Sequence, residues 1–174
     1  LSRYHIQKDE ELPEEIYEEL VGQVLTKRAK LRAMHLLEKM DRTRAELKKK
    51  LEQSGYPTKA VEEALKYVES FHYIDDVRYA ARYIEFQKSK KGKARLKMEL
   101  LQKGISAEIV ARALEEAEEQ MDAKETIRKM LQSKRKGEGA MEEKEKQRLY
   151  GFFMRKGFSS SEILSVFREI SDKE

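Results

Sequence analysis

Apolar residues recur at helical spacing along this chain, and the same apolar pattern surrounds three glycines, Gly55, Gly104 and Gly157. An apolar residue stands eight and four positions before each glycine, directly after it, and six and ten positions after it. A helix that stops at a left-handed residue favours glycine, and an apolar contact across the stop accompanies it. The pattern therefore predicts a helix, a sharp stop and a second helix, repeated three times. The matching residues are Leu47, Leu51, Tyr56, Val61 and Leu65; Leu96, Leu100, Ile105, Val110 and Leu114; and Leu149, Phe153, Phe158, Ile163 and Phe167.

A further amphipathic stretch precedes each of these segments, which predicts three-helix units, and no alternating apolar pattern of strand length occurs. The predicted fold class is all-α, with three tandem three-helix repeats. The predicted domains are an acidic N-terminal helix and lead-in at 1–25 and repeats at 26–72, 73–120 and 121–174. Because one such repeat is too small to be stable alone, neighbouring repeats are expected to share a core.

Short polar residues mark several expected helix starts. The third repeat is expected to start at Asp122, and Ser159 with Glu162 has the spacing of a capping box at its last helix. The pair Asp75 and Asp76 stands before the first helix of the second repeat, where a helix cap is a far more common role than metal binding or general-base chemistry. We expect the third repeat to break at 136–139.

Composition narrows the class of protein. Charged residues make up 40% and aromatic residues 8%, cysteine is absent, and no apolar run approaches the length of a membrane span. Without cysteine there are no disulfides and no thiolate sites, which fits a cytoplasmic protein. The three histidines are scattered, and neither a phosphate-binding loop nor a nucleophile elbow is present. These features predict a non-enzyme without cofactor or metal. Because the chain begins with Leu1, a preceding segment is expected.

Charge is sorted along the chain although the net charge is only +4. Cations recur at thirteen and eleven positions before the three glycines, and at seven positions before the first two. The cations at thirteen and eleven positions before each glycine fall where a helix is expected to start, a place where a positive charge costs ~0.3–1 kcal/mol against the helix dipole. Because this cost recurs at equivalent positions, the cations are expected to form a surface that faces phosphates or an acidic protein. The alternative is that they are solvated side chains, copied when one ancestral repeat was duplicated. We call these eight cations the basic ladder: Arg42, Arg44, Lys48, Lys91, Lys93, Lys97, Lys144 and Lys146.

Aromatic residues do not interleave with the ladder in sequence, as they do in single-strand stacking platforms, and no base-reading motif is visible.

Four stretches of this sequence resemble signatures of the RecX regulatory proteins. The central one, at 71–84, reads FHYIDDVRYAARYI, and the one at 96–105 reads LKMELLQKGI. The first-repeat entry at 42–47 reads RTRAEL, and the third-repeat ending at 152–158 reads FFMRKGF and is followed by Ile163. The likeness covers 26–171; the third unit departs from it by a Lys- and Glu-rich insertion at 135–146, and the acidic N-terminal helix lies outside it.

The resemblance implies an elongated, curved helical array that modulates RecA, the recombinase that polymerises on single-stranded DNA. It implies binding to RecA filaments, limited filament growth, and damped recombination and SOS response. The expected partners are the RecA filament and, through the basic surface, single-stranded or double-stranded DNA. A monomer is expected, and no membrane partner. Two alternatives stay open: a general nucleic-acid-binding helical module, and a structural adaptor in which the ladder plays no part.

Overall fold

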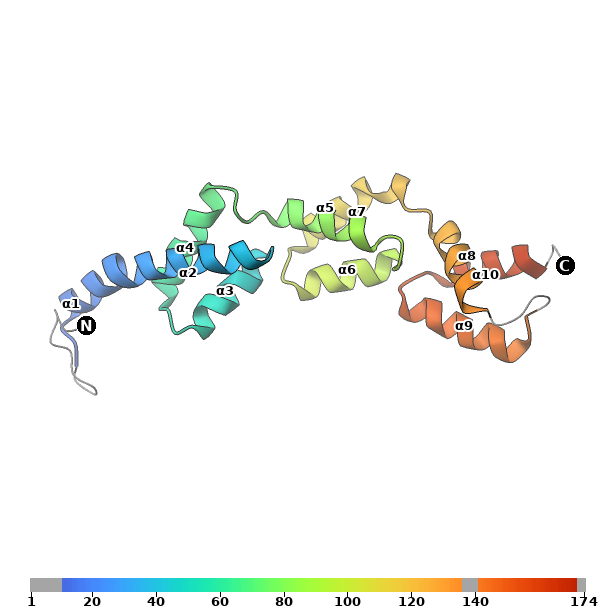
Figure 1. The fold of residues 1–174 in the computed structure, drawn as a ribbon, viewed down its shortest axis with the longest axis horizontal. Coiled ribbons are helices and arrows are strands. Elements are labelled where there is room, and N and C mark those ends of the chain that lie inside the picture. Colours follow the sequence, from blue (N-terminus) through green and yellow to red (C-terminus); the bar gives the residue numbers. More distant parts are fainter. Residues whose placement is uncertain (1–10, 136–140, 172–174) are drawn as a thin grey trace. The chain divides into compact units, whose positions relative to one another are not determined.

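The computed structural model describes residues 11–135 and 141–171, and all regular structure in them is helical (Figure 1). The predicted break at 136–139 lies outside the described residues. The chain divides into two compact units, residues 1–76 and 77–174, which are described separately. Unit 1 contains α1 (Glu14–Glu19), the π-helical turn η2 (Leu20–Leu25), α2 (Thr26–Lys39), α3 (Arg44–Gln53) and α4 (Thr58–Ser70). Unit 2 contains α5 (Asp76–Gln87, whose first residue closes unit 1), α6 (Lys93–Gln102), α7 (Ala107–Glu116), the 3₁₀ turn η3 (Glu118–Gln120), α8 (Ala123–Lys134), α9 (Glu143–Arg155) and α10 (Ser160–Ser171).

The acidic lead-in of unit 1 continues directly into the first repeat. Helix α1 starts after Pro13, and Glu14 and Glu15 in its first turn complement the helix dipole. The wider turn η2 joins α1 to α2, and the Thr26 hydroxyl donates a hydrogen bond to the Val21 carbonyl oxygen at 2.7 Å. Leu20 and Val21 are buried, and η2 packs against α4. The apolar part of the lead-in is thus covered by repeat 1.

The buried side chains form three clusters, one in each three-helix repeat. The cluster of repeat 1 lies between α2, α3 and α4, that of repeat 2 between α5, α6 and α7, and that of repeat 3 between α8, α9 and α10. Within unit 2, the clusters of repeats 2 and 3 are separate, so the expectation of a shared core is wrong for the described residues of these two repeats. Met40 is 57% exposed, because the backbone becomes extended at this residue, directly after α2.

The three glycines adopt the predicted left-handed conformation, with φ of 82° at Gly55, 80° at Gly104 and 86° at Gly157. In each case the residue after the glycine donates its N–H to a carbonyl five residues earlier, as in a Schellman motif. The apolar contact across the stop is also present: the Phe153 and Phe158 ring centroids lie 5.9 Å apart, edge to face. The repeat prediction is confirmed.

The starts of the second helices are stabilised in different ways. At α3, Thr43 and Glu46 form a reciprocal capping box, and the Arg44 N–H donates to Asp76 Oδ1 at 2.9 Å. Asp76 lies within α5, and its carboxylate thus satisfies the first N–H of α3. Burial of this carboxyl raises the pKa of Asp76. The predicted capping box of Ser159 with Glu162 is confirmed, and the Asp122 side chain caps α8 by accepting from the Glu125 N–H.

At α6 the position of Thr43 is taken by Gly92, which has no side chain to cap the helix. The turn between α9 and α10 supplies the acceptors instead. The Gly92 N–H donates to the Lys156 carbonyl at 2.8 Å, and the Ala94 N–H donates to the Gly157 carbonyl at 3.3 Å. A Cβ at Gly92 would lie 2.2 Å from the Gly157 oxygen, and a Cβ at Gly157 would lie 2.3 Å from the Arg95 nitrogen. The two glycines therefore let repeats 2 and 3 meet backbone to backbone.

We predict that Gly157→Ala destabilises the protein more than Gly55→Ala. Both place a side chain at positive φ, which costs about 1 kcal/mol. A Cβ at Gly55 meets no atom within 4 Å, whereas one at Gly157 collides with the backbone of Arg95, which adds roughly 1–3 kcal/mol. Thermal and urea unfolding measure the difference, and amide exchange should be faster at Gly92 and Ala94 in Gly157→Ala alone. Equal destabilisation with unchanged exchange would contradict the backbone contact.

Candidate partner-binding surface

The basic ladder takes equivalent positions in repeats 1 and 2 but not in repeat 3. Arg44 and Lys93 are the first residues of α3 and α6, and Arg42 and Lys91 precede these helices by two residues. Helix α9 starts earlier, at Glu143, so Lys144 and Lys146 both lie within its first turns. Acidic residues at Glu142, Glu143 and Glu145 favour this earlier start through the helix dipole. The expectation that each second helix begins with a cation pair is thus wrong for the third.

In repeat 1 the ladder residues Arg44 and Lys48 are part of an ion-pair network with α4. Arg44 Nε donates to Glu69 Oε1 at 2.7 Å and Arg44 Nη2 donates to Glu62 Oε2 at 2.9 Å, while Lys48 Nζ donates to Glu62 Oε1 at 2.7 Å. Partial burial lowers the pKa of Arg44, but hydrogen bonds and charge from Glu62 and Glu69 outweigh it and raise that pKa. Hydrogen bonds from Lys48 and Arg44 lower the pKa of Glu62. These two cations hold α3 against α4.

The last ladder residue of repeat 1, Arg42, is half-buried. Its Nε atom is buried and has no hydrogen-bond partner within the part of the chain that the structure describes.

Repeat 2 holds a compact polar cluster centred on Glu99 of α6. Glu99 Oε2 accepts from Tyr83 Oη at 2.6 Å and from Lys91 Nζ at 2.7 Å, and Oε1 accepts from Arg95 Nε at 2.7 Å. The Glu99 side chain is 13% exposed. Burial alone would raise its pKa, but the hydrogen bonds from Lys91, Tyr83 and Arg95 lower the pKa of Glu99 to about 2. Glu99 is therefore ionised at neutral pH.

This cluster decides the role of Lys91. Its ammonium lies 2.7 Å from the carboxylate and 5.6 Å from the centroid of the Tyr83 ring. Tyr83 is half-buried, and its hydroxyl donates a hydrogen bond to Glu99. Sequence reasoning missed Arg95 and Glu99, although their spacing of four residues on one helix is a signal for an ion pair.

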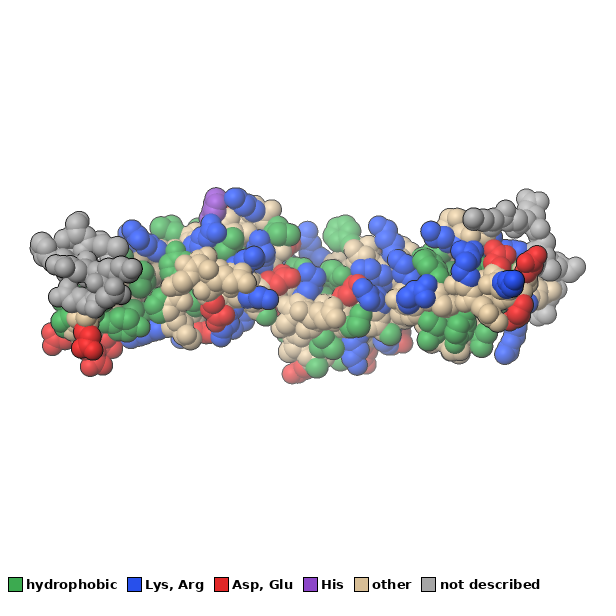
Figure 2. Space-filling view, turned by 90° about the horizontal axis from the view of Figure 1, so that it is seen from below, with side chains coloured by type: hydrophobic (Ala, Val, Ile, Leu, Met, Phe, Trp, Pro, Cys, Tyr) green, Lys and Arg blue, Asp and Glu red, His purple; other side chains and the backbone are tan. Residues whose placement is uncertain are grey.

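The remaining ladder residues are more open. Lys93 pairs with Glu118 at 3.0 Å, and both side chains are more than half exposed. Lys97 and Lys144 are exposed, and no ion pair to another described residue holds either of them. Figure 2 shows Lys and Arg side chains gathered on the viewed face of unit 2, with carboxylates among them. Exposed ion pairs contribute little to stability, so these cations are the ladder residues that a partner could engage.

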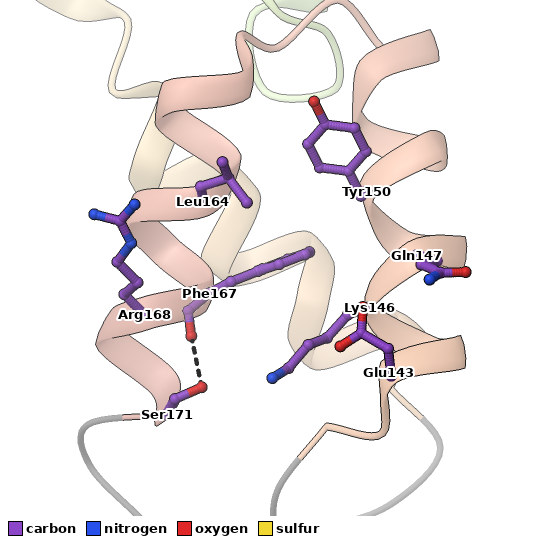
Figure 3. A pocket seen from close by; sticks show the side chains of 8 residues that line it. All are labelled: Glu143, Lys146, Gln147, Tyr150, Leu164, Phe167, Arg168 and Ser171. Carbon is purple, nitrogen blue, oxygen red and sulfur yellow. Dashed lines mark hydrogen bonds between the residues drawn. The ribbon is translucent and has the colours of Figure 1, made fainter.

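Lys146 lies on a groove of about 450 Å³ between α9 and α10. Figure 3 shows Phe167 and Lys146 pointing into the space between the two helices, while Gln147 points away from it. The Ser171 hydroxyl donates to the Phe167 carbonyl at 3.1 Å and secures the last turn of α10. Leu164 and Tyr150 add apolar surface, and Arg168 adds a second cation. The structure thus places Lys146 on an apolar groove, not in a row of cations.

Two other kinds of site can be judged for the described residues. Nowhere in 11–135 or 141–171 do three His, Asp or Glu side chains come together as a metal ion would require. None of the described helices combines the length and apolar character needed to cross a membrane.

Three family models match this chain in sequence order. They describe the first, second and third three-helix domains of RecX and match residues 29–67, 75–114 and 122–167. The chain belongs to the RecX family. Among relatives, Regulatory protein RecX of Clostridium acetobutylicum is 30% identical over 146 residues, which cover 82% of this chain and 68% of that protein.

Solved RecX structures agree with the fold. A crystal structure of regulatory protein RecX aligns with a TM-score of 0.72 at 27% identity, covering 98% of this chain and 85% of the other. RecX from Lactobacillus salivarius aligns with a TM-score of 0.70 at 21% identity, covering 84% of this chain and 97% of the other. The predicted RecX membership and the all-helical fold of three three-helix repeats are confirmed.

We predict that Glu99→Gln destabilises this RecX protein by about 1–3 kcal/mol at neutral pH, because it removes the charge that holds Lys91 and Arg95. The folded-state pKa of Glu99 is depressed, so its stabilisation is full above the unfolded-state pKa of about 4.5. The difference between wild type and variant should shrink as the pH falls from about 5 towards 2. Thermal unfolding across a pH series measures it.

Glu116→Gln is the matched control. Glu116 also accepts from an arginine four residues away, Arg112, but its side chain is 59% exposed. Its neutralisation should leave the midpoint nearly unchanged at every pH. If the thermal unfolding midpoint of Glu99→Gln changes as little as that of Glu116→Gln across the pH series, the stabilising role of the Glu99 cluster is contradicted.

Proposed function

We propose that this protein regulates the RecA recombinase by binding RecA filaments on single-stranded DNA and limiting their growth and activity in recombination and the SOS response. The observation that carries the proposal is the match of three RecX domains, in order, along the chain. The relatives share the name Regulatory protein RecX. The protein would act in the cytoplasm as a monomer, by binding and without catalysis or a cofactor.

Some ladder cations are bound within the protein and others are exposed at its surface. Arg44, Lys48 and Lys91 are bound to carboxylates of their own repeats, so replacing them disturbs the fold. Lys97 and Lys144 are exposed, and their charge is available to a polyanionic partner at little cost in stability. We propose these two as ladder residues that contact the filament. We also propose that the chain consists of a lead-in at 1–25 and repeats at 26–72, 73–120 and 121–174.

A second candidate function is general nucleic-acid binding, in which RecA is incidental. The observation in its favour is the gathering of Lys and Arg side chains on one face of unit 2 (Figure 2). Salt-sensitive affinity for DNA without RecA would favour it. A structural adaptor would instead bind its partner regardless of charge reversal.

We expect the protein, added to RecA on single-stranded DNA, to lower the rate of ATP hydrolysis and to shorten filaments seen by electron microscopy. The physical reason is that a bound helical protein on a filament blocks addition or promotes loss of protomers. An unchanged or raised ATPase rate across a concentration series would contradict the proposed direction of regulation.

The combined variant Lys97→Glu, Lys144→Glu should weaken binding to the RecA filament about tenfold or more and flatten its salt dependence. Lys59→Glu, Lys129→Glu is the control, since it changes net charge equally at side chains that are 67% and 73% exposed. Circular dichroism checks that both variants fold. Equal weakening by the two pairs would show a long-range effect of net charge and overturn the assigned contacts.

A further inference from the structure

A charged cleft of about 420 Å³ lies in unit 2, where the first turns of α6 approach the end of α9. Its position follows from the backbone contact between Gly92 and the turn at Gly157. Two segments that are about 60 residues apart in sequence are thus held together by hydrogen bonds between main-chain atoms. The lining residues are Lys91, Arg95, Glu99, Phe152, Arg155 and Lys156.

The cleft has an excess of positive charge. Four cations line it, and Glu99 is the one carboxylate among its lining residues. Both Glu99 oxygens are already occupied by Lys91, Tyr83 and Arg95. Arg155 and Lys156 have no ion pair with any described residue, and the Lys156 and Gly157 carbonyls at this helix end already accept the Gly92 and Ala94 N–H groups. The cations at the end of α9 are therefore not needed to satisfy that helix end, and an anion in the cleft would complete the charge balance.

An aromatic ring stands beside these cations. Phe152 is half-buried, and the ammonium groups of Lys156 and Lys134 lie 5.7 Å and 5.6 Å from its ring centroid. In sequence no aromatic residue interleaves with the ladder, but the fold brings Phe152 of repeat 3 next to Lys91 and Arg95 of repeat 2. An aromatic face beside converging cations is the combination that binds a base together with its phosphate.

We propose that this cleft binds a nucleotide unit, with the phosphate among Arg95, Arg155 and Lys156 and the base or sugar against Phe152. Arginine presents a planar set of donors that matches phosphate oxygens. A base can reach Phe152 only when it is unstacked, as in a single strand or a free nucleotide; in a duplex the base faces are covered. The acidic side chains of a protein partner would use the cations but leave the ring without a stacking partner.

The inference concerns the protein alone and is independent of the proposed action on RecA. Binding is measured in two arms without RecA: fluorescence anisotropy with a labelled oligothymidylate, and calorimetric titration with ATP and ADP. Binding of the oligonucleotide alone identifies a single strand as the source of the nucleotide. Binding of ATP or ADP, with competition against the oligonucleotide, identifies a free nucleotide. Absence of binding in both arms would overturn the proposal.

The variant Arg155→Gln, Lys156→Gln should weaken binding at least tenfold and reduce the log–log salt slope by about 1.4, since each lost contact to a single strand contributes about 0.7. Lys124→Gln, Lys129→Gln on α8 is the control with the same change in net charge and should bind like wild type. Phe152→Leu keeps an apolar side chain for the core and removes the stacking face, and should weaken binding about tenfold.

Three results would contradict the assignment of the cleft. One is equal binding by the Arg155→Gln, Lys156→Gln variant and its control. Another is wild-type affinity in Phe152→Leu. The third is displacement of the oligonucleotide by polyglutamate as effectively as by unlabelled oligothymidylate, which would indicate a site for acidic protein. Circular dichroism and thermal midpoints establish that each variant is folded before its affinity is compared.

Discussion

Each repeat depends on how its second helix stops. A glycine at positive φ ends α3, α6 and α9, and the chain reverses there without the steric cost that a side chain would impose. The residue after the glycine then packs across the stop, and the third helix covers the same apolar cluster. Without that reversal the apolar faces of the second and third helices could not meet in so short a segment. The constraint is local, and it recurs once in every repeat.

The start of the second helix carries the longer-range contacts. The first N–H of α3 is satisfied by the Asp76 carboxylate, and the start of α6 is satisfied by carbonyls of the turn at Gly157. The first N–H groups of a helix have no acceptor within that helix. In α3 and α6, some of these groups donate to acceptors that lie far away in the sequence. Within unit 2 this joins repeats whose buried cores remain separate clusters. Backbone hydrogen bonds at a close glycine contact thus take the place of a shared apolar core.

The cations divide into two groups under the same physical rule. Where a carboxylate is within reach and partly buried, as for Lys91 beside Glu99, the charge is used inside the protein. Where the side chain is exposed, as for Lys97, the charge stays available at the surface. The proposed contacts to a RecA filament draw on the second group. The proposed nucleotide cleft draws on Arg95, Arg155 and Lys156, which sequence periodicity did not single out. Family membership supports a regulator; the charge arrangement suggests where such a regulator touches its partners.

The sequence by itself determined the helical repeats, the three glycine stops and the RecX family, because each depends on local spacing: a φ preference, a helical period and a short motif. It also predicted the capping box of Ser159 with Glu162 for the same reason. The tertiary structure decided which ladder cations are bound within the protein, since only packing brings Glu62 and Glu69 to Arg44. The cleft beside Phe152 likewise exists only in the fold, because its two walls are about 60 residues apart and meet through glycines whose lack of a side chain matters only when another backbone approaches.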